Sequence, residues 1–292
     1  MRRSVVAMDT TVTIEVGTGE SREAEATLRR AFAWFQRVET TCSRFDADSE
    51  LSRLNASSGE PVRVPPLLLE PLGFALALAE ETGGAFDPTV GAAMAAAGFD
   101  RNYRTGERTD ARAATDATFR DVIFDRRARQ VRLRRPLTLD LGAVAKGFAI
   151  DLAARELAGF ERVAVSAGGD LLIRTPDGER FEVGIQHPRD AEALIEVLSL
   201  GEGAVCTSGD YQRVSAGGHH LLDGRCRRPA LEAASVTVVA STAMLADGLS
   251  TAAFALGPER GLELLVASGV EGVIVTPDLE WHATPGFWEL RR

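Results

Sequence analysis

The segment ADGLSTAAFALG, residues 246–257, carries a pair of residues with a clear chemical meaning. Asp247 and Thr251 are four positions apart, so on a helix their side chains share one face. A carboxylate and a hydroxyl are hard oxygen ligands of the kind that Mg²⁺ binds, with water and phosphate oxygens completing its shell. The same spacing also suits an acidic helix start followed by a threonine that bonds its own backbone.

A second segment, LDLGAVAKGFAIDLAA (residues 139–154), has the pattern of a buried strand, a glycine-containing turn and a helix. Lys146 lies where the N–H groups and dipole of a helix N-terminus favour an anion such as phosphate. The residue order differs from the G-x-x-x-x-G-K-[ST] of a P-loop. Lys146 is therefore a phosphate ligand or a surface lysine, and Asp140 caps the turn or binds a ligand; the segment alone leaves both open.

Glycine turns follow several predicted strands, at TGGAFDPTVG (82–91), SAGGD (166–170) and TSGDY (207–211). Each alone is more typical of a tight turn than of a ligand site, because glycine readily adopts positive φ. His220 adjoins His219 and precedes Asp223 by three positions, which favours a catalytic base only modestly. Signatures of dinucleotide sites, P-loops, nucleophile elbows and H-E-x-x-H zinc sites are absent.

The hydrophobic pattern predicts the strands and helices that must position these segments. Strands are expected at 11–16, 121–124, 130–134, 138–141, 162–166, 170–174, 181–185, 196–200, 204–207, 234–239 and 272–276. Helices are expected at 23–38, 49–54, 66–81, 145–157, 241–255 and 258–267, with a small alanine-rich helix after residue 91. Strands in runs with interspersed helices favour an α+β fold over a doubly wound sheet.

Composition excludes several classes of protein. The 292 residues carry a net charge of −9, whereas a nucleic-acid surface needs clustered basic residues. Three cysteines without a C-x-x-C pair indicate neither a disulfide framework nor a zinc site. No signal sequence or long apolar run is present, which predicts a cytoplasmic protein without a membrane segment. We expect one domain over residues 1–292, with a surface loop at 100–118.

Taken together, these segments give the chain a resemblance to the FAD:protein FMN transferases, the ApbE family of flavin transferases. The resemblance extends from about Met8 to Gly257, nearly the whole chain. It rests on eight blocks in the family's order: MDTTVTI, CSRFDADSELSRLN, TGGAFDPTVG, LDLGAVAKGFAID, SAGGD, TSGDY, HLLD and ADGLSTAAFALG.

The resemblance implies a fold and an activity. The fold would have mixed or antiparallel sheets with packed helices, in two intertwined α/β subdomains related to the T-fold. The activity would be Mg²⁺-dependent transfer of the FMN moiety of FAD to a serine or threonine hydroxyl of an acceptor flavoprotein, with release of AMP. FAD is then a substrate, and Mg²⁺ between its phosphates would neutralise charge during phosphoryl transfer.

The resemblance also implies roles for individual residues. Positions expected to contact FAD are Met8, Phe45, Ala85, Phe86, Asp87, Asp140, Lys146, Ser208 and Gly209. The carbonyl of Ala143 and the side chains of Asp247 and Thr251 would bind the metal. His220 would take the proton of the attacking hydroxyl, and Asp247 would be the second catalytic residue.

The sequence departs from the family pattern in the loop after the histidine. Family members commonly have H-x-x-D-P-x-T-G, whereas this chain has HLLDGRCRRP, with Gly224 in place of the proline. A milder change is Asp9, where glycine is common. The altered loop leaves two alternatives open: an FAD pyrophosphate hydrolase that gives FMN and AMP, and a non-catalytic FAD-binding protein.

Overall fold

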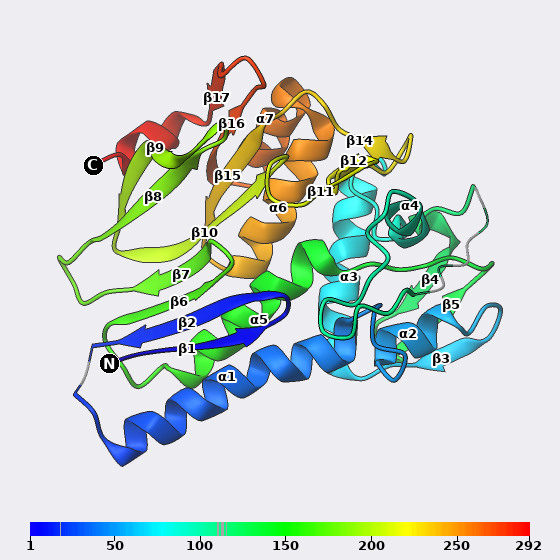
Figure 1. Ribbon diagram of the computed structural model, residues 1–292, viewed down its shortest axis with the longest axis horizontal. Helices are drawn as coiled ribbons and strands as arrows, with labels where there is room; N and C mark the ends of the chain where they lie inside the picture. The colour runs from blue at the N-terminus through cyan, green and yellow to red at the C-terminus, as the bar shows by residue number, and fades with distance from the viewer. Residues whose placement is uncertain (18, 110, 112–113, 115) are drawn as a thin grey trace.

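A computed structural model describes the chain from residue 1 to residue 292, except residues 18, 110, 112, 113 and 115. An eight-stranded antiparallel sheet forms its centre, with the strand order β1-β2-β6-β7-β10-β15-β16-β17 (Figure 1). These strands are β1 (Arg2–Ala7), β2 (Thr10–Val16), β6 (Val163–Ala167), β7 (Asp170–Arg174), β10 (Glu202–Gly209), β15 (Ser235–Ala240), β16 (Glu271–Val275) and β17 (Trp281–Ala283).

Helices cover one face of this sheet and a β-hairpin covers part of the other. The helices on this face are α1 (Arg22–Cys42), α5 (Gly142–Glu156), α6 (Ala243–Leu256) and α7 (Pro258–Ala267), and the remaining helices are α2 (Glu50–Asn55), α3 (Pro66–Glu81) and α4 (Gly91–Ala96). The hairpin of β8 (Phe181–His187) and β9 (Asp190–Leu200) forms a second, smaller core with the 3₁₀ helix η2 (Pro285–Leu290). Buried on both faces, β15 is apolar almost throughout, as such strands must be.

The chain leaves the central sheet after β2 and returns to it at β6. Between them it builds α1 to α4 and a three-stranded sheet of β3 (Pro61–Arg63), β5 (Gln130–Leu133) and β4 (Val122–Asp125), with the 3₁₀ helix η1 (Phe119–Asp121). This excursion lies beside the central sheet and intertwines the two parts (Figure 1). The α+β fold with antiparallel sheets and packed helices is therefore confirmed.

Most predicted elements occur, strands β1, β3 and β17 were not predicted, and several other differences fall near the site. The predicted helices at 66–81 and 258–267 match α3 and α7. The predicted strand at 138–141 is wrong, because only Thr138 forms an isolated bridge, with Val90. Helix α5 begins at Gly142 rather than residue 145, which places Ala143 in its first turn. Two small hairpins were not predicted: β11 (Val214–Ser215) with β12 (Gly218–His219), and β13 (Leu222–Asp223) with β14 (Arg228–Pro229).

The surface loop predicted at residues 100–118 lies partly outside the described residues. Within its described part, the side chains of Asn102 and Ala117 are buried. The Asn102 side-chain amide donates to the carbonyl of Phe45 at 3.1 Å, which ties this segment to the candidate site.

Candidate active site

Helix α6 carries the predicted pair Asp247 and Thr251, and its first turn is firmly capped. Thr242 is the N-cap, and its hydroxyl accepts the N–H of Leu245 at 3.3 Å. The carboxylate of Asp151, from α5, accepts the N–H groups of Ala243 and Met244 at 2.7 and 3.0 Å. These bonds satisfy donors that a helix start otherwise leaves free, so they fix α6 against α5.

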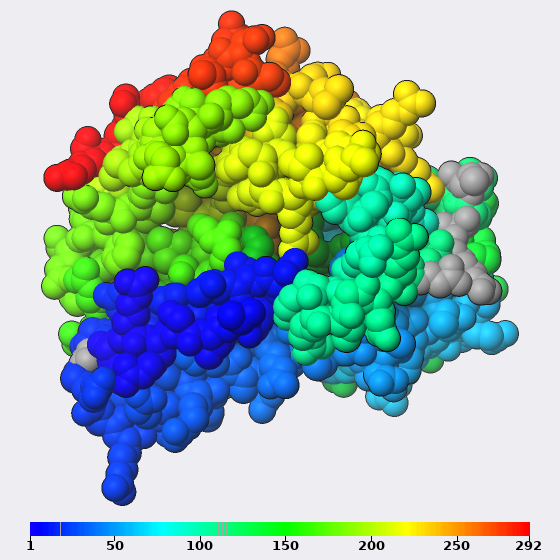
Figure 2. All heavy atoms as spheres, viewed as in Figure 1, coloured from blue at the N-terminus to red at the C-terminus, as the bar shows by residue number. Residues whose placement is uncertain are grey.

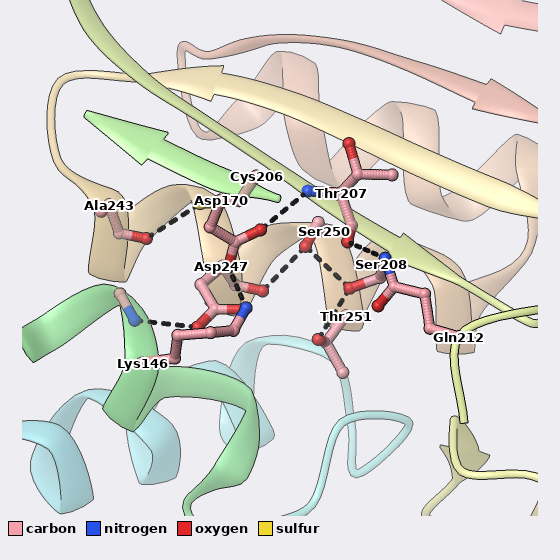
Figure 3. A network of polar contacts seen from close by, with 11 residues as sticks. Lys146, Asp170, Cys206, Thr207, Ser208, Gln212, Ala243, Asp247, Ser250 and Thr251 are labelled. Carbon is pink, nitrogen blue, oxygen red and sulfur yellow. Dashed lines mark hydrogen bonds and ion pairs between the residues drawn. The ribbon is translucent and has the colours of Figure 1, made fainter. Parts of the chain in front are cut away.

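Asp247 is almost fully buried between α6 and α5. Its Oδ2 accepts the N–H of Gly147 at 3.0 Å, and its Oδ1 lies 3.4 Å from Nζ of Lys146 (Figure 3). Burial raises the pKa of Asp247 to about 7, and the nearby Asp170 adds to the rise, while Lys146 opposes it. Its negatively charged form is therefore unfavourable in this buried position unless a further positive charge lies nearby.

Thr251 lies one turn beyond Asp247, and its hydroxyl contacts Ser208 of β10 at 3.1 Å (Figure 3). Ser208 also bonds Ser250 at 2.9 Å, and the Ser250 hydroxyl donates to the carbonyl of Asp247. It is thus Ser250, not Thr251, that bonds its own helix backbone. Ser208 was expected in the cleft wall and lies beside Thr251.

The donor set on α5 and α6 fits a small hard cation. The N–H of Gly147 donates to Asp247, which brings this carboxylate to the first two turns of α5, where Ala143 also lies. Lys146, Asp170 and Asp247 carry one ammonium for two carboxylates, and this excess of one negative charge favours a cation. Among the described residues no group of three His, Cys, Asp or Glu side chains could hold a metal.

The structure places Lys146 in an ion pair. Its ammonium makes a close contact with Asp170, the first residue of β7, and a longer one with Asp247. Burial opposes the charge of Lys146, but the two carboxylates outweigh it and raise its pKa above the usual value. Asp170 did not feature in the sequence prediction, although it ends the SAGGD block. Contact of Lys146 with FAD stays a prediction.

Asp140 joins three segments at the start of α5. Its Oδ1 accepts the N–H of Gly142 at 2.7 Å, so the capping alternative holds. Its Oδ2 accepts Nε of the buried Arg44 at 2.5 Å, and the Arg44 guanidinium lies 4.0 Å over the ring of Phe45. Burial alone would raise the pKa of Asp140, but Arg44 and the Gly142 N–H lower it. Phe45 and Asp140 therefore share Arg44 as a contact, and Arg44 was not predicted; contacts of Phe45 and Asp140 with FAD stay predictions.

The two adjacent histidines have different environments. His219 is buried, with its ring 5.7 Å from that of Phe254. His220 lies against Phe99 at 6.2 Å between ring centroids, and its Nδ1 is 3.3 Å from the carbonyl of Arg213. Burial, assisted by the charge of Arg213, lowers the pKa of His220 to about 4, and Asp140 is near enough to oppose this. The imidazole is therefore neutral at neutral pH and able to accept a proton.

The TGGAFDPTVG turn packs against the loop that departs from the family pattern. The N–H of Gly224 donates to the carbonyl of Ala85 at 2.8 Å. A Cβ at Gly224 would lie 2.5 Å from the carbonyl oxygen of Gly84, so the loop has no room for a side chain there. A cavity of about 440 Å³ lies between the two segments. The substitution in the loop thus has a structural explanation.

Residues 85–87 are buried and make their contacts mainly within and around the TGGAFDPTVG turn. Ala85 and Phe86 are buried, and the Asp87 carboxylate accepts hydrogen bonds from Thr89 and from the N–H of Phe119. Burial raises the pKa of Asp87. The next residue, Pro88, accepts the N–H of Asp140 at 2.7 Å, which brings the turn to the rest of the site. Contacts of residues 85–87 with flavin stay predictions.

Met8 lies in the β1–β2 turn, where it and Asp9 have φ of 53° and 62°. Positive φ explains why glycine is common at the second position, and Asp is among the residues that tolerate it. Asp9 pairs with Arg213 at 3.3 Å, which joins the turn to the hairpin of His220. Gly209, at the end of β10, packs against Tyr211, whose ring would clash with a Cβ there.

The predicted residues thus gather around one region of the molecule. One cluster consists of Asp247, Thr251, Ser208 and Lys146. A second group, which consists of Asp140, Phe45 and His220, lies at the start of α5. Figure 2 shows the surface hollowed between the blue N-terminal strands, the blue-green α4 segment and the yellow hairpins. No helix of the described residues is both long and apolar enough to cross a membrane.

Comparisons with known proteins agree with this arrangement. The chain matches the ApbE family over residues 8–274. It is 32% identical to the FAD:protein FMN transferase of Treponema pallidum over 90% of this chain and 81% of that protein. The corresponding protein of Vibrio cholerae is 29% identical over 89% and 81%.

Solved structures give the same result. The ApbE protein of Thermotoga maritima has a TM-score of 0.88 and 30% identity, over 100% of this chain and 99% of that one. The flavin transferase ApbE of Vibrio cholerae has a TM-score of 0.84 and 26% identity, over 99% and 98%. Since the family match spans nearly the whole sequence and the fold agrees throughout, this chain belongs to the ApbE family.

Proposed function

We propose that this chain transfers the FMN moiety of FAD to a serine or threonine hydroxyl of an acceptor protein and releases AMP. Its relatives carry the name FAD:protein FMN transferase. The observation that carries the proposal is that two groups of residues lie at the N-terminal part of α5: Asp140 bonds Gly142 at the start of the helix, near Phe45 and His220, and Asp247, beside Thr251 and Ser208, bonds Gly147 one turn further on. A pyrophosphate substrate needs charge neutralisation, and an attacking hydroxyl needs a base.

The first part of this proposal concerns the metal. Asp247, Thr251 and the carbonyl of Ala143 would hold Mg²⁺, which when bound polarises phosphorus and stabilises charge on the leaving phosphate. The excess carboxylate of the Lys146, Asp170 and Asp247 cluster supports this assignment. Ser208 orients the Thr251 hydroxyl through its 3.1 Å contact.

The second part concerns the proton. His220 is neutral at neutral pH, so it can take the proton of the acceptor hydroxyl as the hydroxyl oxygen bonds to phosphorus and the phosphoanhydride bond to AMP breaks. Phe99 and the Arg213 carbonyl hold the imidazole in place. Asp140 is fixed by Arg44 and by the N–H of Gly142, and its negative charge acts on this histidine.

The alternative of an FAD pyrophosphatase was motivated by the altered loop at residues 224–227. That loop is accommodated by the hydrogen bond from Gly224 to Ala85, which a proline could not donate. The alternative of a non-catalytic FAD-binding protein leaves the buried excess charge around Asp247 without a purpose. Both alternatives predict products that differ from those of transfer.

One experiment separates the three. The chain is incubated with FAD, Mg²⁺ and a peptide that contains serine or threonine after an acidic residue, and peptide mass, FMN and AMP are measured. A peptide heavier by FMN, with an equal amount of AMP, supports transfer. FMN and AMP with unmodified peptide support hydrolysis, and unchanged FAD contradicts both. In the same assay, His220→Ala tests the proposed base. His282 lies on β17, so His282→Ala is the control for that variant and should keep wild-type turnover.

A further inference from the structure

Asp170 is a buried acid that the proposed reaction does not use. Its exposed fraction is 1%, and it follows two glycines with φ of 59° and 96° in the turn that connects the antiparallel strands β6 and β7. Its Oδ1 accepts the N–H of Thr207 from β10 at 3.2 Å, and its Oδ2 makes the close contact with the Lys146 ammonium (Figure 3). The backbone of the sheet therefore fixes its orientation.

Lys146 has two carboxylates within reach, and it is nearer to Asp170. The 3.4 Å separation between Nζ and Oδ1 of Asp247 is long for a charge-assisted bond, which is normally about 2.7–2.9 Å. Oδ2 of Asp247 is engaged by the N–H of Gly147. Oδ1 is thus the weakly engaged oxygen of this carboxylate, on the helix that also carries Thr251.

We infer that Asp170 is a positioning residue that holds the Lys146 ammonium to one side, so that Oδ1 of Asp247 is open to a divalent cation. The inference rests on the proposed metal site. An ammonium in full contact with Asp247 would neutralise that carboxylate and repel a second cation at the same oxygen. Binding the lysine to a fixed neighbouring acid keeps its positive charge near the phosphates without blocking the metal.

The test uses Mn²⁺ as the probe, with the full chain in the absence of FAD and free Mn²⁺ measured by electron paramagnetic resonance. Asp170→Asn keeps the shape and an acceptor for Thr207 but releases the lysine. We expect it to weaken Mn²⁺ binding about tenfold, the size of a coupling between neighbouring charges. The double variant Asp170→Asn/Lys146→Met removes the competing ammonium as well and should restore wild-type affinity or exceed it.

The rescue distinguishes positioning from mere structural support. Weak binding by both variants, or wild-type binding by Asp170→Asn, would overturn the inference. Asp121→Asn loses an acid paired with Arg135 at 3.2 Å, on a different element, and should bind Mn²⁺ as the wild type does. The wild type and Asp247→Ala test the metal site itself: if neither binds Mn²⁺, the metal assignment fails together with this inference, whereas failure of the rescue alone removes only the role of Asp170.

Discussion

The two halves of the candidate site are built in different ways. The helical half, α5 and α6, carries Lys146 and Asp247 on long helices whose polar groups are buried and bonded from both sides. The hairpin half, residues 213–229, has strands of two residues each, carries His220 in the bend between β12 and β13, and has several exposed side chains. Rigid helices suit a site for metal and phosphate, and short surface hairpins suit the side from which an acceptor protein must approach.

Burial acts in opposite chemical senses in the two halves. In the helical half it raises the pKa of Asp247, whose charge then has to be balanced. In the hairpin half it lowers the pKa of His220, which keeps the imidazole neutral. Burial disfavours the charged form in both cases: it leaves Asp247 in need of a positive partner, and it keeps His220 unprotonated while making it a weaker base.

The largest effect should come from the helical half. Asp247→Ala removes the carboxylate expected to hold the metal and should lower turnover of FAD about 10³-fold, since a metal contributes several kcal/mol to such a reaction. AMP release, followed by chromatography, measures it. Asp247→Asn keeps the shape and is the control for folding. Activity above a tenth of wild type in the alanine variant would remove the metal assignment.

A second effect should come from the hairpin half. His220→Gln removes the proposed base and should lower transfer about 10²-fold, at the lower end for general base catalysis. Because the pKa of His220 is about 4, the wild-type rate should lose activity only as the pH falls towards that value. An unperturbed histidine would lose it near 6.5. A decline centred near 6.5 that is absent in the glutamine variant would contradict the burial of this residue.

Stability should depend on the junction of the two helices. Asp151→Ala leaves the N–H groups of Ala243 and Met244 without their acceptor, and we expect a loss of about 1–3 kcal/mol in the free energy of unfolding. Urea denaturation measures it. Thr242→Ala removes the ordinary cap and should cost about 1 kcal/mol. An equal or smaller loss in Asp151→Ala would show that α6 does not depend on α5 for its position.

In the hairpin half, Gly224→Pro restores the residue common in the family and should nevertheless be harmful here. It removes the N–H that bonds Ala85 and places a Cβ 2.6 Å from that of Asp87. We expect a loss of about 1–3 kcal/mol in thermal or urea denaturation. Gly159→Ala is the matched control, because a Cβ there meets nothing within 4 Å. A stable Gly224→Pro variant would mean that the loop can move away from the turn.

The sequence predicts the long helices of the molecule well. Helix α3 begins at Pro66 and ends before Thr82-Gly83-Gly84, and both limits are visible in the sequence because proline favours a helix start and glycine an end. The two-residue strands of the hairpin half are too short to show a period, so they could not be predicted. The segment 138–141 has the composition of a strand, but its neighbours are loops and helix ends, and no strand pairs along it.

The candidate site follows the same division. The spacing of Asp247 and Thr251 fixes their common face, because both lie on one helix. The pairing of Lys146 with Asp170 depends on how α5 packs on β7, and this packing is set by the whole fold rather than by local sequence. Arg44 was missed because its partner Asp140 is distant in sequence, and a buried arginine has no local signal.

The smallest predicted effect tests whether the pKa of His220 depends on the charge of one neighbouring residue or on the total charge of the hairpin half. Arg213 is one of the causes that lower the pKa of His220, after burial, so Arg213→Ala should move the acid limb of the rate profile to higher pH by less than about one unit. Arg225→Ala, in the same half but paired with Asp223, is the control and should leave the limb in place. If both variants shift the acid limb equally, the hairpin half acts on His220 through its total charge. The hairpin half would then differ from the helical half, where specific contacts act on Asp247.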